Sequence, residues 1–183
     1  MPNTRSIVVS ASLLLAIVLT APFASGADLL DYERSIRTSD GYLRAILREG
    51  VASSPALSKL VARLRRSDVV VYLVRDRALP GHLDGETSFL TAAAGRRYLY
   101  VKIAWDRVPL RHIATLAHEL QHAAEIADAP WVVNSESLAQ EYERIGFHST
   151  IQTGHTGRRA YESAAAREMG ERVWREFAST AGD

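Results

Sequence analysis

The chain has 183 residues, of which 47% are hydrophobic and 23% charged, and these proportions are typical of a globular protein rather than a disordered one. Its 22 basic and 21 acidic residues leave a formal net charge of +1, so the charge gives no reason to expect nucleic acid as a partner. The absence of cysteine excludes disulfides, thiolate ligands and cysteine nucleophiles. Any bound metal must therefore be held by nitrogen and oxygen atoms.

Residues 1–27 are predicted to be a secretory signal peptide. Arg5 supplies the positive start, the apolar run Ile7–Leu19 follows, and small residues occupy 24–27. The run is shorter than the roughly 20 residues of a membrane span, so we expect no stable span after cleavage, with an uncleaved signal anchor as the alternative. The sequence thus predicts an exported protein, periplasmic or secreted, in which residues 28–183 form one domain.

Apolar residues at helical spacing are the main feature of the chain before residue 66. They predict a helix over Asp28–Glu49, which Gly41 divides or interrupts. A second, short helix is expected to begin near Pro55 and to run through Leu64, because proline is well tolerated in a first helical turn.

The pattern then changes to β-forming residues. Val69–Val74 predicts a buried strand, and Thr87–Ala92 and Arg97–Ile103 predict two more strands that form a hairpin. These segments are expected to make a small mixed sheet of three strands. Arg96 and Arg97, at the start of the last strand, are expected to be solvated charges.

Three helices are predicted in the second half of the chain. The clearest spans Asp106–Asp128, with Pro109 in its first turn; another covers Glu136–Ile145, and the last runs from about Arg158 to Phe177. Helices placed at both ends of the chain, around a central group of strands, indicate the α+β class. We expect one central helix and further helices to pack on the three-stranded sheet.

The sequence HELQH at positions 118–122 is an H-E-x-x-H motif within the clearest helix. Residues i and i+4 share one helix face, so His118 and His122 can bind one ion, and zinc accepts neutral imidazole nitrogen. Glu119 lies about 100° round the helix from His118 and can reach a water at the ion as general base. The pattern predicts a zinc site with His118 and His122 as ligands and Glu119 as the catalytic residue.

This motif, on a helix that follows a small sheet, resembles the zincin superfamily of zinc metallopeptidases, and the short chain is similar to small gluzincins. The resemblance covers about residues 69–177. It implies a zinc-dependent hydrolase that cleaves peptide bonds with metal-activated water. A peptide or protein substrate would lie extended along the edge strand within Thr87–Ile103. The alternative is an exported protein that binds zinc or a partner without catalysis.

In gluzincins a glutamate from a downstream helix is the third ligand, and the resemblance implies Glu162 in this role. Glu162 precedes a run of alanines that would let two helices approach closely. Glu136 and Asp128 remain alternatives. Glu125 is expected on the same helix face as the two histidines, where it orients a ligand, binds substrate or is only a solvated charge.

The remaining histidines are less informative. His112 falls on a different helix face from His118 and is expected at the surface. His148, His155 and Tyr161 lie near the start of the last predicted helix, where any of them can donate a hydrogen bond to a developing oxyanion. Each of them taken singly is more typical of an ordinary loop residue.

Overall fold

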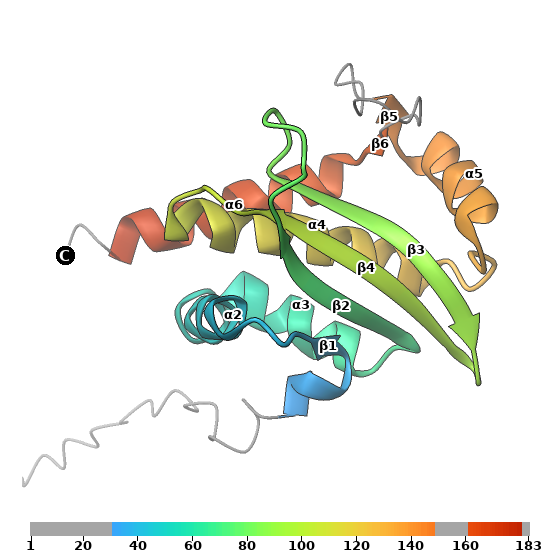
Figure 1. The fold of residues 1–183 in the computed structure, drawn as a ribbon, viewed down its shortest axis with the longest axis horizontal. Helices are drawn as coiled ribbons and strands as arrows, with labels where there is room; N and C mark the ends of the chain where they lie inside the picture. Colours follow the sequence, from blue (N-terminus) through green and yellow to red (C-terminus); the bar gives the residue numbers. More distant parts are fainter. Residues whose placement is uncertain (1–30, 149–160, 181–183) are drawn as a thin grey trace, which may run out of the picture.

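The computed structural model describes residues 31–148 and 161–180 of the chain (Figure 1). The predicted signal peptide and His155 lie outside these ranges. The α+β class predicted from the sequence is confirmed, because helices surround one mixed sheet. None of the described helices is both long and apolar enough to cross a membrane.

The elements follow one another in an order close to the predicted one. They are the 3-10 helix η1 (Asp31–Arg34), β1 (Ile36–Arg37), α2 (Gly41–Ser53), α3 (Pro55–Arg65), β2 (Val69–Asp76), β3 (Gly85–Ala93), β4 (Arg96–Ala104), α4 (Pro109–Asp128), α5 (Ser135–Ile145), β5 (Phe147–His148), β6 (Tyr161–Glu162) and α6 (Ala164–Thr180).

The main sheet has the strand order β1-β2-β4-β3. β1 and β4 run parallel to β2, whereas β3 runs antiparallel to β4 and forms the edge of the sheet. The predicted β3–β4 hairpin is confirmed, and its turn places Ala94 and Gly95 at positive φ, 51° and 71°. Two successive residues at positive φ match the twist of a tight hairpin, and glycine adopts that conformation without strain.

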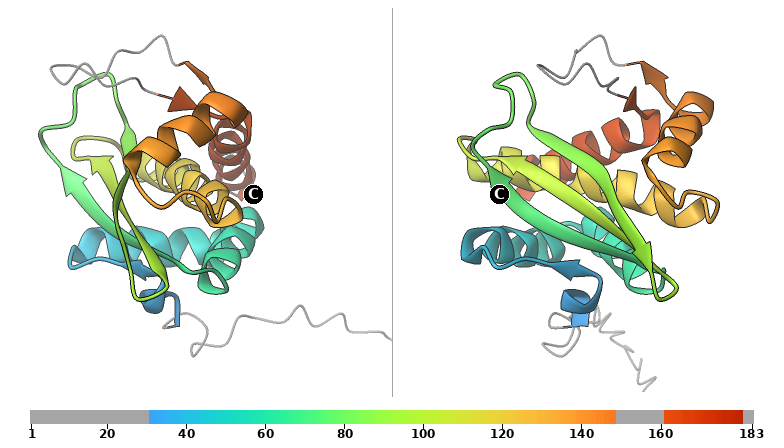
Figure 2. Two further views of the ribbon diagram at one scale, coloured as in Figure 1. Left: turned by 90° about the vertical axis from the view of Figure 1, so that its right-hand side faces the viewer. Right: turned by 45° about the vertical axis from the view of Figure 1, so that its right-hand side comes forward.

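One face of the sheet is apolar and is covered by α4, with α3 and α6 packed against α4 on the side away from the strands (Figure 2). The strands contribute the fully buried Leu73, Leu99 and Val101, and α4 contributes Leu116 and Leu120. Each such side chain stabilises the fold by roughly 1.5–3 kcal/mol. This packing fixes the opposite, polar face of α4 in one orientation.

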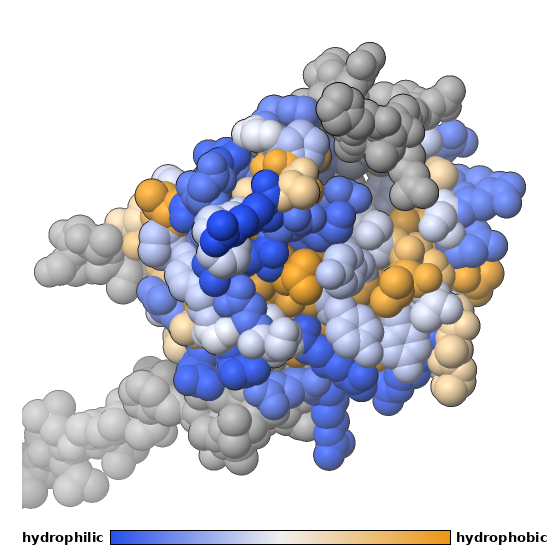
Figure 3. All heavy atoms as spheres, in the orientation of Figure 1, coloured by the Kyte–Doolittle hydropathy of each residue, from blue (hydrophilic) through white to orange (hydrophobic). Residues whose placement is uncertain are grey.

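The outer face of the sheet is only half-buried. It carries Tyr72, Tyr98 and Tyr100, and the rings of Tyr72 and Tyr98 stack with centroids 6.2 Å apart. On this side of the molecule, apolar residues are interspersed with polar ones (Figure 3). The alternation of aliphatic and tyrosine side chains along β4 therefore separates a core face from a partly solvated face.

The sheet has four strands rather than the predicted three, because the helix expected over Asp28–Glu49 is wrong before Gly41. Ile36 lies in β1, is buried and pairs with Val71. The side chain of Asp40 accepts hydrogen bonds from the first backbone N–H groups of α2, which starts the helix at this point. A strand of two residues leaves no alternation that could be read from the sequence.

The last helix begins at Ala164 and not near Arg158, and Glu162 lies in β6 rather than inside the helix. The hydroxyl oxygen of Ser163 accepts the backbone N–H of Ala166 at 3.0 Å, as an N-cap residue does. The alanine run hid this boundary, because alanine favours a helix wherever it stands.

Arg97 is buried, 4% exposed, so the expectation of a solvated charge is wrong. Its Nη1 donates to the carbonyl oxygens of Ile126 and Ala129, at 2.6 Å each, and its Nε and Nη2 contact Asp68 at 2.7 Å. This salt bridge holds the pKa of the Asp68 carboxyl below its usual value. Arg97 thus adds charged hydrogen bonds to carbonyl groups at the end of α4 and ties that end to the sheet.

Replacing Arg97 is therefore expected to destabilise the protein strongly. We expect Arg97→Met to lower the free energy of unfolding by about 1.5–3 kcal/mol, since it removes the charged hydrogen bonds to the carbonyl groups and to Asp68. The neighbouring Arg96 is exposed, and Arg96→Met should change stability by less than about 0.5 kcal/mol. Urea unfolding followed by circular dichroism measures both variants, and equal stabilities would contradict the assignment.

Candidate metal centre

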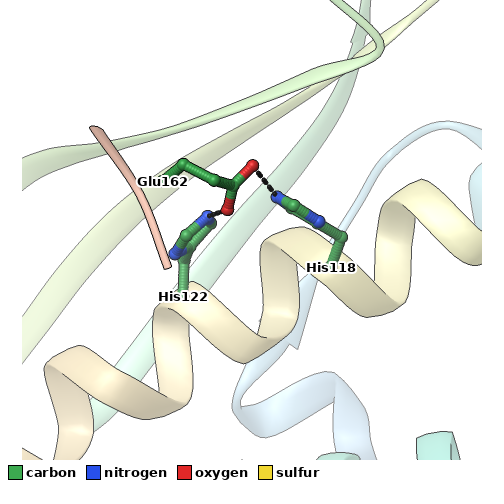
Figure 4. Close-up of side chains that lie close together, drawn as sticks. All are labelled: His118, His122 and Glu162. Carbon is green, nitrogen blue, oxygen red and sulfur yellow. Dashed lines mark ion pairs between the residues drawn. The ribbon is translucent and has the colours of Figure 1, made fainter. Parts of the chain in front are cut away.

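His118 and His122 stand one turn apart on α4, and Glu162 reaches them from β6 (Figure 4). Nε2 of His118 lies 3.4 Å from Oε2 of Glu162, and Nε2 of His122 lies 3.6 Å from Oε1. The three donor atoms lie within 4.8 Å of one another, and no other such group of His, Asp or Glu side chains occurs among the described residues. The predicted ligand set is thus assembled from two separate parts of the chain.

These separations suit a shared ion better than direct hydrogen bonds. Nitrogen and oxygen atoms joined by a hydrogen bond are usually 2.7–3.2 Å apart. Two ligands at about 2.0–2.2 Å from a tetrahedral zinc ion lie about 3.4 Å from each other. The distances of 3.4 and 3.6 Å, which join the imidazole nitrogens to different oxygens of Glu162, therefore approach the separation expected of ligands that share one ion.

The charges of the centre also favour a cation. Burial raises the pKa of Glu162, but His118 and His122 outweigh it and hold that pKa well below its ordinary range. Burial alone lowers the pKa of His122, but Glu125 and Glu162 outweigh it and raise the pKa above its ordinary value. The carboxylates around the two histidines thus give the centre a negative charge that a divalent ion can offset.

Glu119 lies next to His118 in the chain, and its side chain is held by contacts with the edge strand β3. It is 5% exposed, its Oε2 accepts the hydroxyl of Thr87 at 2.7 Å, and burial raises its pKa. A Cβ atom at Gly85 would lie 2.5 Å from Oε1 of Glu119, so only glycine leaves room for this carboxylate. Neither Gly85 nor Thr87 is a predicted site residue, although their spacing places both on one face of β3.

Gly170 allows α6 to approach His118 of α4 closely. A Cβ atom at this position would lie 3.3 Å from Cβ of His118 and 3.2 Å from the carbonyl oxygen of Ala114. Such contacts are tight, so a larger residue would move α6 away from α4 or displace His118. A glycine within a helix, where it lowers stability, was the available sequence signal.

Glu125 lies on the ligand face of α4 and contacts His122, with 3.0 Å between Oε2 and Nδ1. The hydroxyl of Tyr142, from α5, lies 2.8 Å from the same Nδ1 and donates to Oε2 of Glu125 at 2.9 Å. Of the three roles left open for Glu125, a solvated charge is wrong, and the contact with His122 favours orientation of a ligand. Nothing in the sequence marked Tyr142.

The two alternative third ligands do not approach the imidazoles. Asp128 is exposed and pairs with Arg63 at the far end of α4. Glu136 is exposed in the first turn of α5 and takes no part in the group of donor atoms. The helix does continue through Glu125, as expected, and it carries Asp128 away from the site.

The expectation that His112 lies at the surface is wrong. His112 is buried, and its ring nitrogens lie 2.7 Å from the hydroxyl of Tyr42 and 2.8 Å from the carbonyl oxygen of Ala104. Tyr161 directs its hydroxyl to Glu143 at 3.1 Å rather than toward the donor atoms. Neither residue is therefore placed to stabilise an oxyanion at the centre.

Comparison of the chain with protein-family models, with curated proteins and with solved structures gave no match. A function for this chain has to be inferred from its own residues. The described residues offer imidazole nitrogens and a carboxylate oxygen that could hold a metal ion, with the buried carboxylate of Glu119 beside them.

Glu162→Gln is expected to weaken zinc binding sharply, because the amide offers no negative charge to the ion. The purified protein should bind about one zinc ion per chain, measured by metal analysis and by competition with a chromogenic chelator. Glu136→Gln and Asp128→Asn are matched controls that remove the alternative carboxylates and should bind zinc as the parent does. Equal affinity of the parent and Glu162→Gln would show that the third ligand lies elsewhere.

Proposed function

We propose that this chain is an exported zinc-dependent hydrolase, and specifically a metallopeptidase, with His118, His122 and Glu162 as metal ligands and Glu119 as general base. The observation that carries the proposal is the convergence of the two imidazoles and the distant carboxylate beside a buried glutamate. A structural zinc site has all four positions filled by protein, whereas three protein ligands leave one position for water or substrate.

Access to the centre is consistent with turnover. The side chains of His118 and Glu162 are 23% and 22% exposed, while Glu119 and His122 are buried. A substrate could therefore reach the centre from the side of His118 and Glu162. The buried side keeps Glu119 in a medium of low polarity, where its charge interacts strongly with a nearby proton donor.

The edge of the sheet offers a place for a peptide substrate. β3 pairs with β4 along one edge and, within the described residues, with no strand along the other. β3 also supplies Thr87 and Gly85, which contact Glu119. An extended peptide added to the free edge of β3 would run beside the general base, and its backbone would provide affinity without requiring particular side chains.

In the proposed reaction Glu119 moves the proton. Bound zinc would act as a Lewis acid that polarises the scissile carbonyl group and lowers the pKa of the attacking water. Glu119 accepts the proton of the attacking water at its carboxylate and later donates it to the leaving amine. Thr87 fixes one carboxylate oxygen through its hydroxyl, so Glu119 presents the other oxygen in a defined orientation.

Glu119→Gln tests the general base directly. We expect hydrolysis of peptides to fall about 100- to 10,000-fold, because glutamine cannot accept the proton, while zinc affinity is maintained since Glu119 is not a ligand. Cleavage of a diverse peptide library, followed by mass spectrometry, measures the effect. If the zinc-loaded parent cleaves no member of the library, the alternative of a non-catalytic, exported zinc-binding protein is favoured.

Gly85→Ala is expected to separate catalysis from metal binding. The added methyl group would lie less than 3 Å from Oε1, Cγ and Cδ of Glu119 and must displace this side chain, so kcat should fall about 100-fold while zinc affinity changes little. Gly81→Ala is the control, because no atom lies within 4 Å of a Cβ at that position. Unchanged kcat in Gly85→Ala would mean that the position of the carboxylate does not limit the reaction.

A further inference from the structure

Glu125 uses both of its carboxylate oxygens within the site, although it is not one of the three donor residues. Its side chain is 11% exposed. Oε2 lies 3.0 Å from Nδ1 of His122 and accepts the hydroxyl of Tyr142, while Oε1 accepts the hydroxyl of Ser163 at 2.6 Å. Burial raises the pKa of Glu125, but these contacts outweigh it and keep the pKa below its ordinary value.

Ser163 connects Glu125 to the third ligand. It directly follows Glu162, and its backbone N–H donates to Oε1 of Glu162 at 2.8 Å. Its hydroxyl oxygen accepts the N–H of Ala166 and so caps α6, while its hydroxyl proton goes to Glu125. One serine therefore fixes the start of α6, the direction of Glu162 and the distance of both from α4.

The strand that carries Glu162 has little other backbone support. β6 consists of Tyr161 and Glu162, and it pairs only with the two residues of β5 among the described strands. A two-residue ladder is too short to fix a ligand by itself. The bond from Ser163 to Glu125 is thus a direct polar connection between the third ligand's segment and the helix of the two histidines.

We propose that Glu125 is a positioning residue that joins the two halves of the metal centre. Its Oε2 holds His122, and its Oε1 holds Ser163, which in turn orients Glu162. The proposal rests on the proposed metal site. Glu125 and Ser163 would then raise metal affinity indirectly, by orienting His122 of α4 and Glu162 of β6. Groups that orient ligands in this way typically change metal affinity about 10- to 100-fold when they are removed.

Glutamine is an informative replacement for Glu125, because it has the same shape but only one acceptor oxygen. An NH₂ group donates and cannot accept, so when it faces His122 and Tyr142 it cannot take the hydroxyl proton of Tyr142. When it faces Ser163 it can only donate to Oγ, which already accepts the N–H of Ala166. In either orientation one of the hydrogen bonds that the carboxylate accepts is lost. Ser163→Ala removes the second connection together with the cap of α6, and it leaves the contact with His122 in place.

The experiment compares the parent, Glu125→Gln, Ser163→Ala and the double variant by zinc competition with a chelator. We expect each single variant to bind zinc about 10- to 100-fold more weakly. The double variant should lose less than the product of the two single losses, because both act on one connection. Glu168→Gln and Ser179→Ala, on exposed positions of α6, are the matched controls and should bind zinc as the parent does.

Two readouts separate this role from simple stabilisation of the fold. The visible absorption of the Co²⁺-substituted protein reports the arrangement of the ligands and should change in Glu125→Gln and Ser163→Ala but not in the controls. Amide hydrogen exchange of the metal-free protein should become faster near Ser163 and Ala166 in Glu125→Gln, while α4 stays protected.

The outcomes are distinct for the two proposals. If the parent binds zinc and Glu125→Gln has the same affinity and the same cobalt spectrum, the positioning role is refuted and the proposed metallopeptidase is unaffected. If the single losses multiply in the double variant, Glu125 and Ser163 act independently and the connection between them is refuted. If the parent binds neither zinc nor cobalt, both proposals are refuted together.

Discussion

The approach of β6 and α6 to one face of α4 is the constraint on which the centre depends. Two imidazoles come together through helix geometry alone, because residues four apart share a face. Glu162 has no such local reason to be near them, and it arrives only because α6 packs along α4 with Gly170 at the crossing. The apolar face of α4 packs on the sheet, so β6 and α6 both approach a helix that is already fixed in place.

The parts of the structure that depend on local pattern were predictable from the sequence. The α+β class, the hairpin of β3 and β4, and the helix that carries the motif all follow from strong periodicity and from prolines at helix ends. Glu162 was proposed as the third ligand by resemblance, and it does approach both imidazoles, yet its placement inside a helix was wrong. The capping role of Ser163 was obscured by the alanines that follow it.

The parts that depend on long-range contact were not predictable from the sequence. Arg97 looked like a surface charge because its partners, carbonyl groups at the end of α4, leave no trace in side-chain pattern. His112 and Tyr142 likewise find buried partners on other elements. Polar side chains can be buried where the fold gives each of them a hydrogen-bond partner. The sequence shows which residues can donate or accept, but it does not show which of them meet.

The position of Glu162 near the end of the described chain has a consequence for synthesis. A polypeptide emerges from the ribosome with its N-terminus first, so the sheet, α4 and the two histidines are complete well before the strand that carries the carboxylate. A nascent chain can fold much of its core while its candidate metal centre still lacks Glu162. The proposed activity is therefore withheld until the segment that carries Glu162 has been synthesised.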